Sequence, residues 1–212
     1  MRLIGLTGGV ATGKSLAARL FAQRGATILS ADTVAHRLTA PGMPLVHEIG
    51  NELGSRFTHD GVLNRSALGE YVFNDPDARR KLESIIHPHV MRELRRRIRA
   101  LRNRKTPPEV VVVEVPLLFE VGMEDWFDEV VTVISSEDDQ ISRMRDRDGL
   151  DESAARARVR AQMPLEEKAA RADHVIVNSG PVADLESQVD AIMANSARGN
   201  LSRTAKYHLE TA

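Results

Sequence analysis

The sequence predicts an α/β protein with one parallel, doubly wound sheet. Short β-branched apolar runs recur along the chain, and they are continuous rather than alternating, as in strands that are buried on both faces. Stretches with helical spacing separate these runs, which is typical of βαβ units. A glycine-rich segment lies between the first run and the first helical stretch. The five predicted strands are residues 3–7, 27–30, 110–115, 130–134 and 175–177.

The glycine-rich segment, residues 8–15, reads GGVATGKS and matches the G-x-x-x-x-G-K-S pattern of a P-loop. Its glycines let successive backbone N–H groups point at phosphate oxygens, and the N-terminus of the following helix adds partial positive charge. Lys14 would bridge the β- and γ-phosphates, and the Ser15 hydroxyl would ligate Mg²⁺. The flanking strand and helix disfavour a plain glycine-rich turn, so we expect the chain to bind a nucleoside triphosphate. The expected nucleotide-binding residues are Gly8, Gly9, Ala11, Thr12, Gly13, Lys14, Ser15 and Leu16.

A long insertion follows the second predicted strand. About 80 residues separate that strand from the third, which is far more than a crossover connection needs. The insertion is predicted to be helical at 44–53, 66–73, 76–86 and 88–104, where Pro88 suits a first helical turn. A helical insertion at the ligand edge of a sheet is plausible as a cap that binds the acceptor substrate.

A second insertion, at about 146–162, has the pattern of a charged helical hairpin with Gly149 at its turn. Its arginines favour a lid over phosphates, and a pair of solvated charged helices is an equally good interpretation of the composition. We therefore expect one P-loop domain at 1–198, with a core at 1–35 and 108–198 and the first insertion at about 36–107. Residues 199–212 are expected to form a flexible tail. The lid arginines are Arg147, Arg156, Arg158 and Arg160.

Composition narrows the function classes. The net charge is −1, so no overall field favours nucleic acid or a membrane surface. The chain contains no Cys, which excludes disulfides, thiolate metal sites and cysteine nucleophiles. No apolar run approaches the length of a membrane span, and the first strand leaves no room for a signal peptide. These features favour a cytoplasmic protein.

Other features of the sequence restrict the reaction class further than the P-loop alone does. No Lys in the chain is followed two positions later by Asp, so the base-reading element of GTPases is missing. A small chain with a cap and an arginine lid favours a kinase for a small molecule, because a closed lid excludes water from the donor.

Asp32 is the predicted catalytic base. It follows the second strand, at the carboxyl edge where ligands bind to such sheets. A carboxylate there can accept the proton of an acceptor hydroxyl that is aligned with the γ-phosphate. Asp32 also suits the N-cap of a helix at 33–38, and the two roles are compatible.

Several motifs together resemble the dephospho-CoA kinase family. They are Leu6–Ser15 with its P-loop, Ala31-Asp32, His87-Pro88, the run PLLFE at 116–120, Arg147-Asp148, AQMPL at 161–165 with Glu167-Lys168, Ala172-Asp173 and Asn178-Ser179-Gly180. They occur in the family's order and span nearly the whole chain. The P-loop is generic, whereas PLLFE and Asn-Ser-Gly are more specific. The resemblance implies an adenylate-kinase-like five-stranded sheet, ATP as donor, and the ribose 3′-hydroxyl of dephospho-CoA as acceptor in the last step of coenzyme A synthesis.

The resemblance also implies roles for single residues. Asp32 would be the base, with Lys14 and Arg147 acting on the donor phosphates. Arg143 would lie against the adenine and Asn178 would border it, although Asn-Ser-Gly is also simply a good turn. His87 and Leu117 would lie at the acceptor, although a helix junction explains His87-Pro88 equally well. The family often has Asp where this chain has Glu114, so a contact of Glu114 with Mg²⁺ is left open.

Two alternatives remain from the sequence. The closer one is another small P-loop kinase, for a nucleoside monophosphate or a sugar. The more distant one is a nucleic-acid-binding module that uses residues 92–105, where eight basic residues accompany the single acidic Glu93. We expect ATP and dephospho-CoA as the small-molecule partners, no nucleic acid, no membrane, and a monomer.

Overall fold

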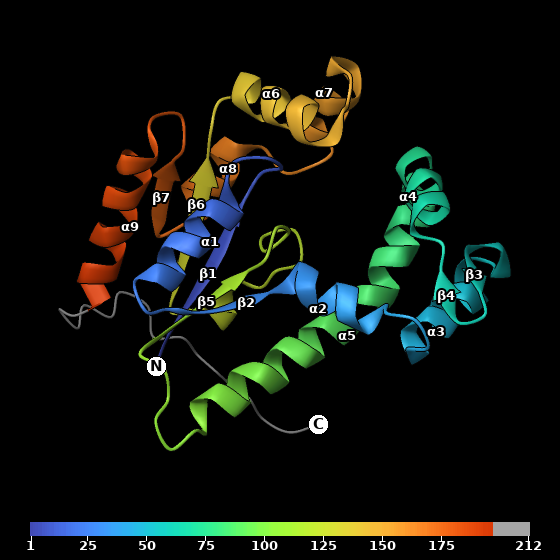
Figure 1. The fold of residues 1–212 in the computed structure, drawn as a ribbon, viewed down its shortest axis with the longest axis horizontal. Helices are drawn as coiled ribbons and strands as arrows, with labels where there is room; N and C mark the ends of the chain where they lie inside the picture. Colours follow the sequence, from blue (N-terminus) through green and yellow to red (C-terminus); the bar gives the residue numbers. More distant parts are fainter. Residues whose placement is uncertain (197–212) are drawn as a thin grey trace. The chain divides into compact units, whose positions relative to one another are not determined.

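The computed structural model of the chain describes residues 1–196 (Figure 1). The chain divides into two compact units. Met1–Leu29 and the chain from Thr106 onward form the first unit, and Ser30–Lys105 forms the second. The expected tail at 199–212 lies outside the described residues.

The first unit contains a five-stranded sheet with the strand order β2-β5-β1-β6-β7. Strand β1 pairs in parallel with β5 on one side and with β6 on the other, and β6 pairs in parallel with β7. All five predicted strands are confirmed, with small differences at their ends. They are β1 (Arg2–Gly8), β2 (Thr27–Ser30), β5 (Val110–Glu114), β6 (Glu129–Ile134) and β7 (His174–Val177). Because the chain winds to one side of β1 and then to the other, a ligand site is expected at the carboxyl end of β1.

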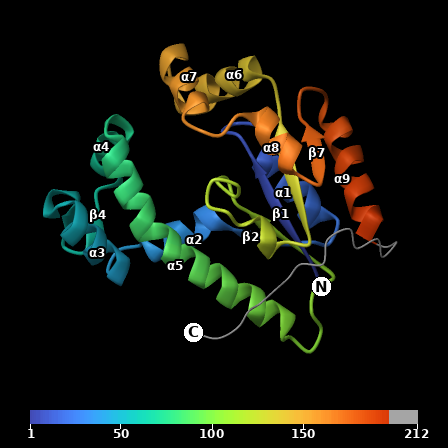
Figure 2. The same ribbon diagram turned by 180° about the vertical axis from the view of Figure 1, so that it is seen from behind.

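Helices cover both faces of this sheet. Helices α1 (Lys14–Gln23) and α9 (Val182–Ser196) lie side by side on one face, and α8 (Leu165–Arg171) lies on the other (Figures 1 and 2). The core between α1, α9 and the sheet includes Ile4, Phe21 and Val112, all fully buried. In β1, β5 and β6 the apolar runs without alternation are therefore strands with two buried faces, whereas Val175 and Val177 of the edge strand β7 are exposed.

A helical hairpin extends from the end of β6. It consists of α6 (Glu137–Asp148) and α7 (Glu152–Arg160), and Gly149 between them has a φ of 67°. The predicted turn at Gly149 is confirmed, but the first helix of the hairpin begins at Glu137, nine residues before the expected start of the lid. Ser136 explains this early start, because its side chain caps the helix by accepting a hydrogen bond from the Asp139 N–H.

The second unit is mainly helical and has a core of its own. It contains α2 (Ala31–Leu38), α3 (Pro44–Leu53), η1 (Ser55–Phe57), β3 (Thr58–His59), β4 (Val62–Leu63), α4 (Arg65–Asn74) and α5 (Pro76–Arg102). Leu45, Val46 and Ile49 of α3 pack there against Leu68 and Ile85. The β3–β4 hairpin was not predicted, although its Asp60-Gly61 turn is a typical hairpin signal.

The prediction of two helices at 76–86 and 88–104 is wrong. Helix α5 runs without a break from Pro76 to Arg102 and contains Pro88. Proline cannot donate the helical hydrogen bond, which normally costs about 3 kcal/mol within a helix. Ile85 before Pro88 and Val90 after it are both buried, so packing on each side keeps the helix continuous. His87-Pro88 is therefore not a helix junction.

Candidate active site

The P-loop connects β1 to α1, as the sequence predicts. Gly8 has a φ of 146°, and a Cβ there would lie 2.3 Å from the carbonyl oxygen of Val133 in β6. Gly13 is the N-cap of α1 with a φ of 99°, and a Cβ there would lie 2.1 Å from Nδ2 of Asn178. Only glycine fits such a backbone at such close approach. Both glycines of the motif are thus required by the local geometry.

The side chains of the loop turn back onto its own backbone. The buried hydroxyl of Thr12 donates to the carbonyl oxygen of Gly9 at 3.0 Å. The ammonium group of Lys14 donates to the carbonyl oxygen of Gly8 at 3.1 Å and also to that of Gly9. Within residues 1–196, no side chain caps the N-terminus of α1. This terminus can therefore bind an anion through its backbone N–H groups.

The side chains of Ser15 and Glu114 form a hydrogen bond at the carboxyl end of β5. The Ser15 hydroxyl, in the first turn of α1, donates to Oε1 of Glu114 at 3.0 Å. Glu114 is the last residue of β5, the strand beside β1. A hydroxyl and a carboxylate oxygen at this distance are hard oxygen donors of the kind that Mg²⁺ prefers.

Arg143 and Asn178 hold the outer side of the loop. The guanidinium of Arg143, in α6, donates to the carbonyl oxygens of Ala11 at 3.2 Å and Asn178 at 2.8 Å. Asn178, which follows β7, donates through Nδ2 to the carbonyl oxygen of Thr12 at 2.8 Å. The structure thus brings these two predicted residues together with the P-loop.

The helical hairpin packs against the tip of the P-loop. Val10 and Ala11 contact a small apolar cluster formed by Ile141, Met144 and Ala155 of the hairpin. Ala11 has a φ of 55°, a left-handed conformation that is uncommon for a residue with a Cβ. The α6–α7 hairpin therefore packs directly against the P-loop.

Arg147 lies at the end of α6 on this hairpin, and its side chain is 64% exposed. Its guanidinium forms two hydrogen bonds of 2.8 Å with the carboxylate of Asp148. The hydrogen bond from Arg147 lowers the pKa of Asp148 below its ordinary value, against the smaller opposing effect of burial. Arg147 is thus held by its neighbour rather than by the P-loop.

The predicted acceptor residues lie in different units. Leu117 follows β5 in the first unit and is partly buried, whereas Asp32 and His87 belong to the second unit. Leu16 of α1 packs against the core.

Asp32 is exposed in the first turn of α2 and is not the N-cap of that helix. Ser30 caps α2 by accepting a hydrogen bond from the Thr33 N–H at 3.3 Å. The capping role predicted for Asp32 is therefore wrong.

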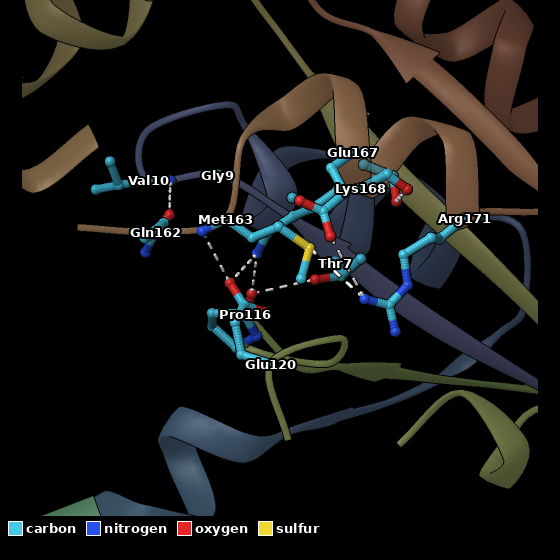
Figure 3. A network of polar contacts seen from close by, with 12 residues as sticks. Thr7, Gly9, Val10, Pro116, Glu120, Gln162, Met163, Glu167, Lys168 and Arg171 are labelled. Carbon is cyan, nitrogen blue, oxygen red and sulfur yellow. Dashed lines mark hydrogen bonds and ion pairs between the residues drawn. The ribbon is translucent and has the colours of Figure 1, made fainter. Parts of the chain in front are cut away.

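Sequence reasoning missed one residue beside the loop. Oε1 of Gln162 accepts a hydrogen bond of 2.8 Å from the backbone N–H of Val10. Gln162 is within the AQMPL motif, but the motif carries no sign of which backbone group its side chain meets. Figure 3 shows Gln162 beside Val10 and Gly9, and Met163 near Glu120.

Comparisons with known proteins identify the family of the chain. The family model for dephospho-CoA kinase (CoaE) matches residues 2–184. The chain is 43% identical over 200 residues to the dephospho-CoA kinase of Syntrophotalea carbinolica, which covers 94% of each chain.

Two solved structures are similar as well. The dephospho-CoA kinase from Campylobacter jejuni has a TM-score of 0.67 and 27% identity, over 94% of this chain and all of that one. The shikimate kinase from Acinetobacter baumannii has a TM-score of 0.53 and 15% identity, over 95% of this chain and 96% of that one, which shows a shared fold. The sheet with its P-loop is thus the fold of small P-loop kinases.

Proposed function

This chain belongs to the dephospho-CoA kinase family, and from that premise we propose how its residues act in transferring a phosphoryl group from ATP to dephospho-CoA. The chain is an ATP-dependent kinase of the final step of coenzyme A biosynthesis. One observation carries this conclusion: the family match runs from β1 through the P-loop and the hairpin to beyond Asn178. The match therefore includes Lys14, Asp32, Arg143, Arg147 and Asn178.

ATP is proposed to bind with its phosphates on the P-loop. The backbone N–H groups at the start of α1 and the Lys14 ammonium would bind the phosphates, because both present positive charge to anionic oxygens. Arg143 and Asn178 flank the loop on its outer side, which supports their roles beside the adenine. The planar guanidinium of Arg143 can stack on a base.

Mg²⁺ is proposed to bind beside Ser15. The oxygen donors of Ser15 and Glu114, 3.0 Å apart, fit this ion. Among the described residues no group of three or more His, Cys, Asp or Glu side chains could hold a metal. Mg²⁺ usually keeps several waters and binds through one or two side chains and the nucleotide phosphates. When bound, the ion neutralises charge on the β- and γ-phosphates.

The acceptor is proposed to react through its ribose 3′-hydroxyl with Asp32 as base. The hydroxyl oxygen forms a bond to the γ-phosphorus, the bond between that phosphorus and the β–γ bridging oxygen breaks, and ADP leaves. The hydroxyl proton moves to the Asp32 carboxylate. Since Ser30 caps α2, the carboxylate at position 32 is not needed as the N-cap of that helix. His87 and Leu117 are proposed to contact the acceptor.

Arg147 is proposed to stabilise charge on the phosphoryl group during transfer. Its exposed guanidinium sits on the hairpin that packs against Val10 and Ala11. A planar cation suits phosphate oxygens, and closure of such a hairpin excludes water from the donor.

The distant alternative, nucleic-acid binding by residues 92–105, has less support. Glu93 pairs with Arg96 and Arg97, each at 2.7 Å, so part of the basic face of α5 is already neutralised. We therefore expect any binding of nucleic acid to depend only weakly on salt concentration.

We further propose that the protein is a monomer that acts in the cytoplasm. Sedimentation and cell fractionation test these two proposals. No helix within residues 1–196 is long and apolar enough to span a bilayer.

The decisive experiment is a direct assay of the reaction. The protein is incubated with ATP, Mg²⁺ and dephospho-CoA, and coenzyme A is detected by mass. Nucleoside monophosphates and sugars serve as competing acceptors, and phosphorylation of one of them in place of dephospho-CoA would contradict the proposal.

Lys14→Ala should lower kcat by about 10²-fold or more, because it removes a positioned charge from the transferring group. The fold should persist, because the ammonium of Lys14 donates to loop carbonyls of Gly8 and Gly9 and Lys14 is not one of the buried core residues. Circular dichroism and single-turnover rates measure the two effects.

A further inference from the structure

Lys168 is a lysine with no exposure to solvent. It lies in α8, and its Nζ forms an ion pair of 2.8 Å with Oε1 of Glu120 and donates to the carbonyl oxygen of Pro116 at 3.0 Å. A fully buried lysine is rare unless it is paired, because transfer of its charge out of water is costly. Figure 3 shows the ammonium directed at these two oxygens. The buried ion pair of Lys168 and Glu120 therefore fixes the positions of the groups that contact it.

The carboxylate of Glu120 also holds the backbone that follows α7. Its Oε1 accepts a hydrogen bond from the Met163 N–H at 3.3 Å. The residue before Met163 is Gln162, whose side chain accepts from the Val10 N–H in the P-loop at 2.8 Å. A continuous series of polar contacts thus runs from Lys168 through Glu120 and residues 162–163 to Val10.

A second series reaches the residue before the loop. The carbonyl oxygen of Pro116 accepts from Nζ of Lys168 and also from the Thr7 hydroxyl at 3.1 Å. Thr7 is fully buried in β1, next to Gly8. The ammonium of Lys168 is therefore linked to the chain on both sides of Gly8 and Gly9.

Packing at Gly9 supports the same connection. A Cβ at Gly9 would lie 3.0 Å from Cδ2 of Leu165, the first residue of α8. The N-terminus of α8 thus lies directly against the loop. Movement of α8 or of residues 162–163 would change the space that the loop occupies.

We infer that Lys168 is a positioning residue for phosphoryl transfer: through Glu120 it fixes residues 162–163, and Gln162 in turn fixes the P-loop at Val10. The inference rests on the proposed binding of ATP by the P-loop. Phosphoryl transfer depends on alignment of donor and acceptor, so a loop displaced by about 1 Å lowers the rate by about 10²-fold. Lys168 itself touches neither substrate in this scheme.

The test is a double-mutant cycle between Lys168 and Gln162. Lys168→Met, Gln162→Ala and the double variant are compared by kcat for coenzyme A formation and by the Kd for ATP from calorimetry. Each single change should lower kcat about 10- to 100-fold and raise the Kd for ATP, with a smaller effect on the Kd for dephospho-CoA. The double variant should resemble the single variants, because the two residues act in one series.

A matched control and a second variant keep the result clear. Glu167→Gln removes a charge next to Lys168 from a side chain that pairs with Arg171 at 3.8 Å, and it should have near-normal kinetics. If Lys168→Met does not fold, Glu120→Gln, which keeps the side-chain volume, replaces it in the cycle.

Multiplicative effects on kcat in the double variant, or a normal kcat in the single variants, would overturn the inference. Failure of the wild-type protein to form coenzyme A would instead overturn the proposed function, and the Kd for ATP would still decide the inference.

Discussion

The hydroxyl of Ser15 donates a hydrogen bond of 3.0 Å to the carboxylate of Glu114, which links the start of α1 to the end of β5. The family resemblance favours an aspartate at position 114, one methylene shorter. The observed contact shows that the longer glutamate still reaches the P-loop hydroxyl.

Glu114→Ala should raise the Mg²⁺ concentration needed for half-maximal rate by about 10- to 100-fold, because residues that orient metal ligands contribute effects of that size. Glu114→Asp keeps the carboxylate and should lie closer to the wild-type protein. The measurement is the initial rate against Mg²⁺ concentration at fixed ATP. An unchanged Mg²⁺ dependence in Glu114→Ala would exclude Glu114 from the metal site.

Asp32→Asn separates catalysis from folding. Asn cannot accept the hydroxyl proton, so kcat should fall by about 10²–10⁴-fold, part of which can reflect lost positioning of the hydroxyl. Thermal stability should hardly change, because Ser30 and not Asp32 caps α2. The measurements are the melting temperature and single-turnover formation of coenzyme A.

Ser30→Ala is the matched control for Asp32. It removes the hydroxyl that accepts from the Thr33 N–H and should cost about 0.5–2 kcal/mol of stability. Its activity should exceed that of Asp32→Asn by a wide margin. Full activity in Asp32→Asn would leave the base to be sought elsewhere.

Arg147→Ala should lower kcat by about 10²-fold or more while the KM for dephospho-CoA changes little, because an arginine that stabilises transferring charge acts on the chemical step. Arg156→Ala is the control on the same hairpin, since Arg156 pairs with Glu137 and Glu152 within it. Steady-state kinetics of both variants are compared. A change confined to the KM of the acceptor would assign Arg147 to the acceptor site.

Glu129→Gln tests a cluster at the amino end of the sheet, where Glu129 contacts Arg2 and lies 2.8 Å from Nε2 of His174. Burial raises the pKa of Glu129, but the hydrogen bonds from His174 and Arg2 together outweigh it and hold the pKa below the ordinary 4.5. Stability from this carboxylate is therefore present above about pH 4.5 and is lost as the pH falls through the lower folded-state pKa.

At pH 7 the variant should be less stable by about 1–3 kcal/mol, because the partly buried Arg2 loses its ionic partner. The difference from the wild-type protein should shrink below pH 4.5. Urea unfolding at several pH values measures it, and a difference that stays constant down to pH 3 would contradict the assignment.

Local patterns predicted the strands and the P-loop correctly because each depends on neighbouring residues. The two buried faces of β1 and β6 require continuous apolar runs, and the turn at Gly8 requires glycine, so both leave signals in the sequence. The hairpin turn at Gly149 was predictable for the same reason.

Features decided by distant residues were not predictable. Pro88 reads locally as a helix start, yet packing of Ile85 and Val90 keeps α5 continuous. Ser30 and Asp32 are both good caps, and only the backbone around Thr33 decides between them. The contact of Gln162 with Val10 spans 152 positions in the chain, and no spacing rule connects such residues.

The close approach of Gly13 to Asn178 makes the two positions evolutionarily dependent on each other. A methyl group at position 13 would lie 2.1 Å from Nδ2 of Asn178, so any side chain there requires a smaller residue at 178. That second change removes the hydrogen bond to the Thr12 carbonyl oxygen and leaves the φ of 99° unfavourable for the new side chain. Neither order of substitution passes through an undamaged intermediate, so this pair should resist drift even when its neighbours diverge.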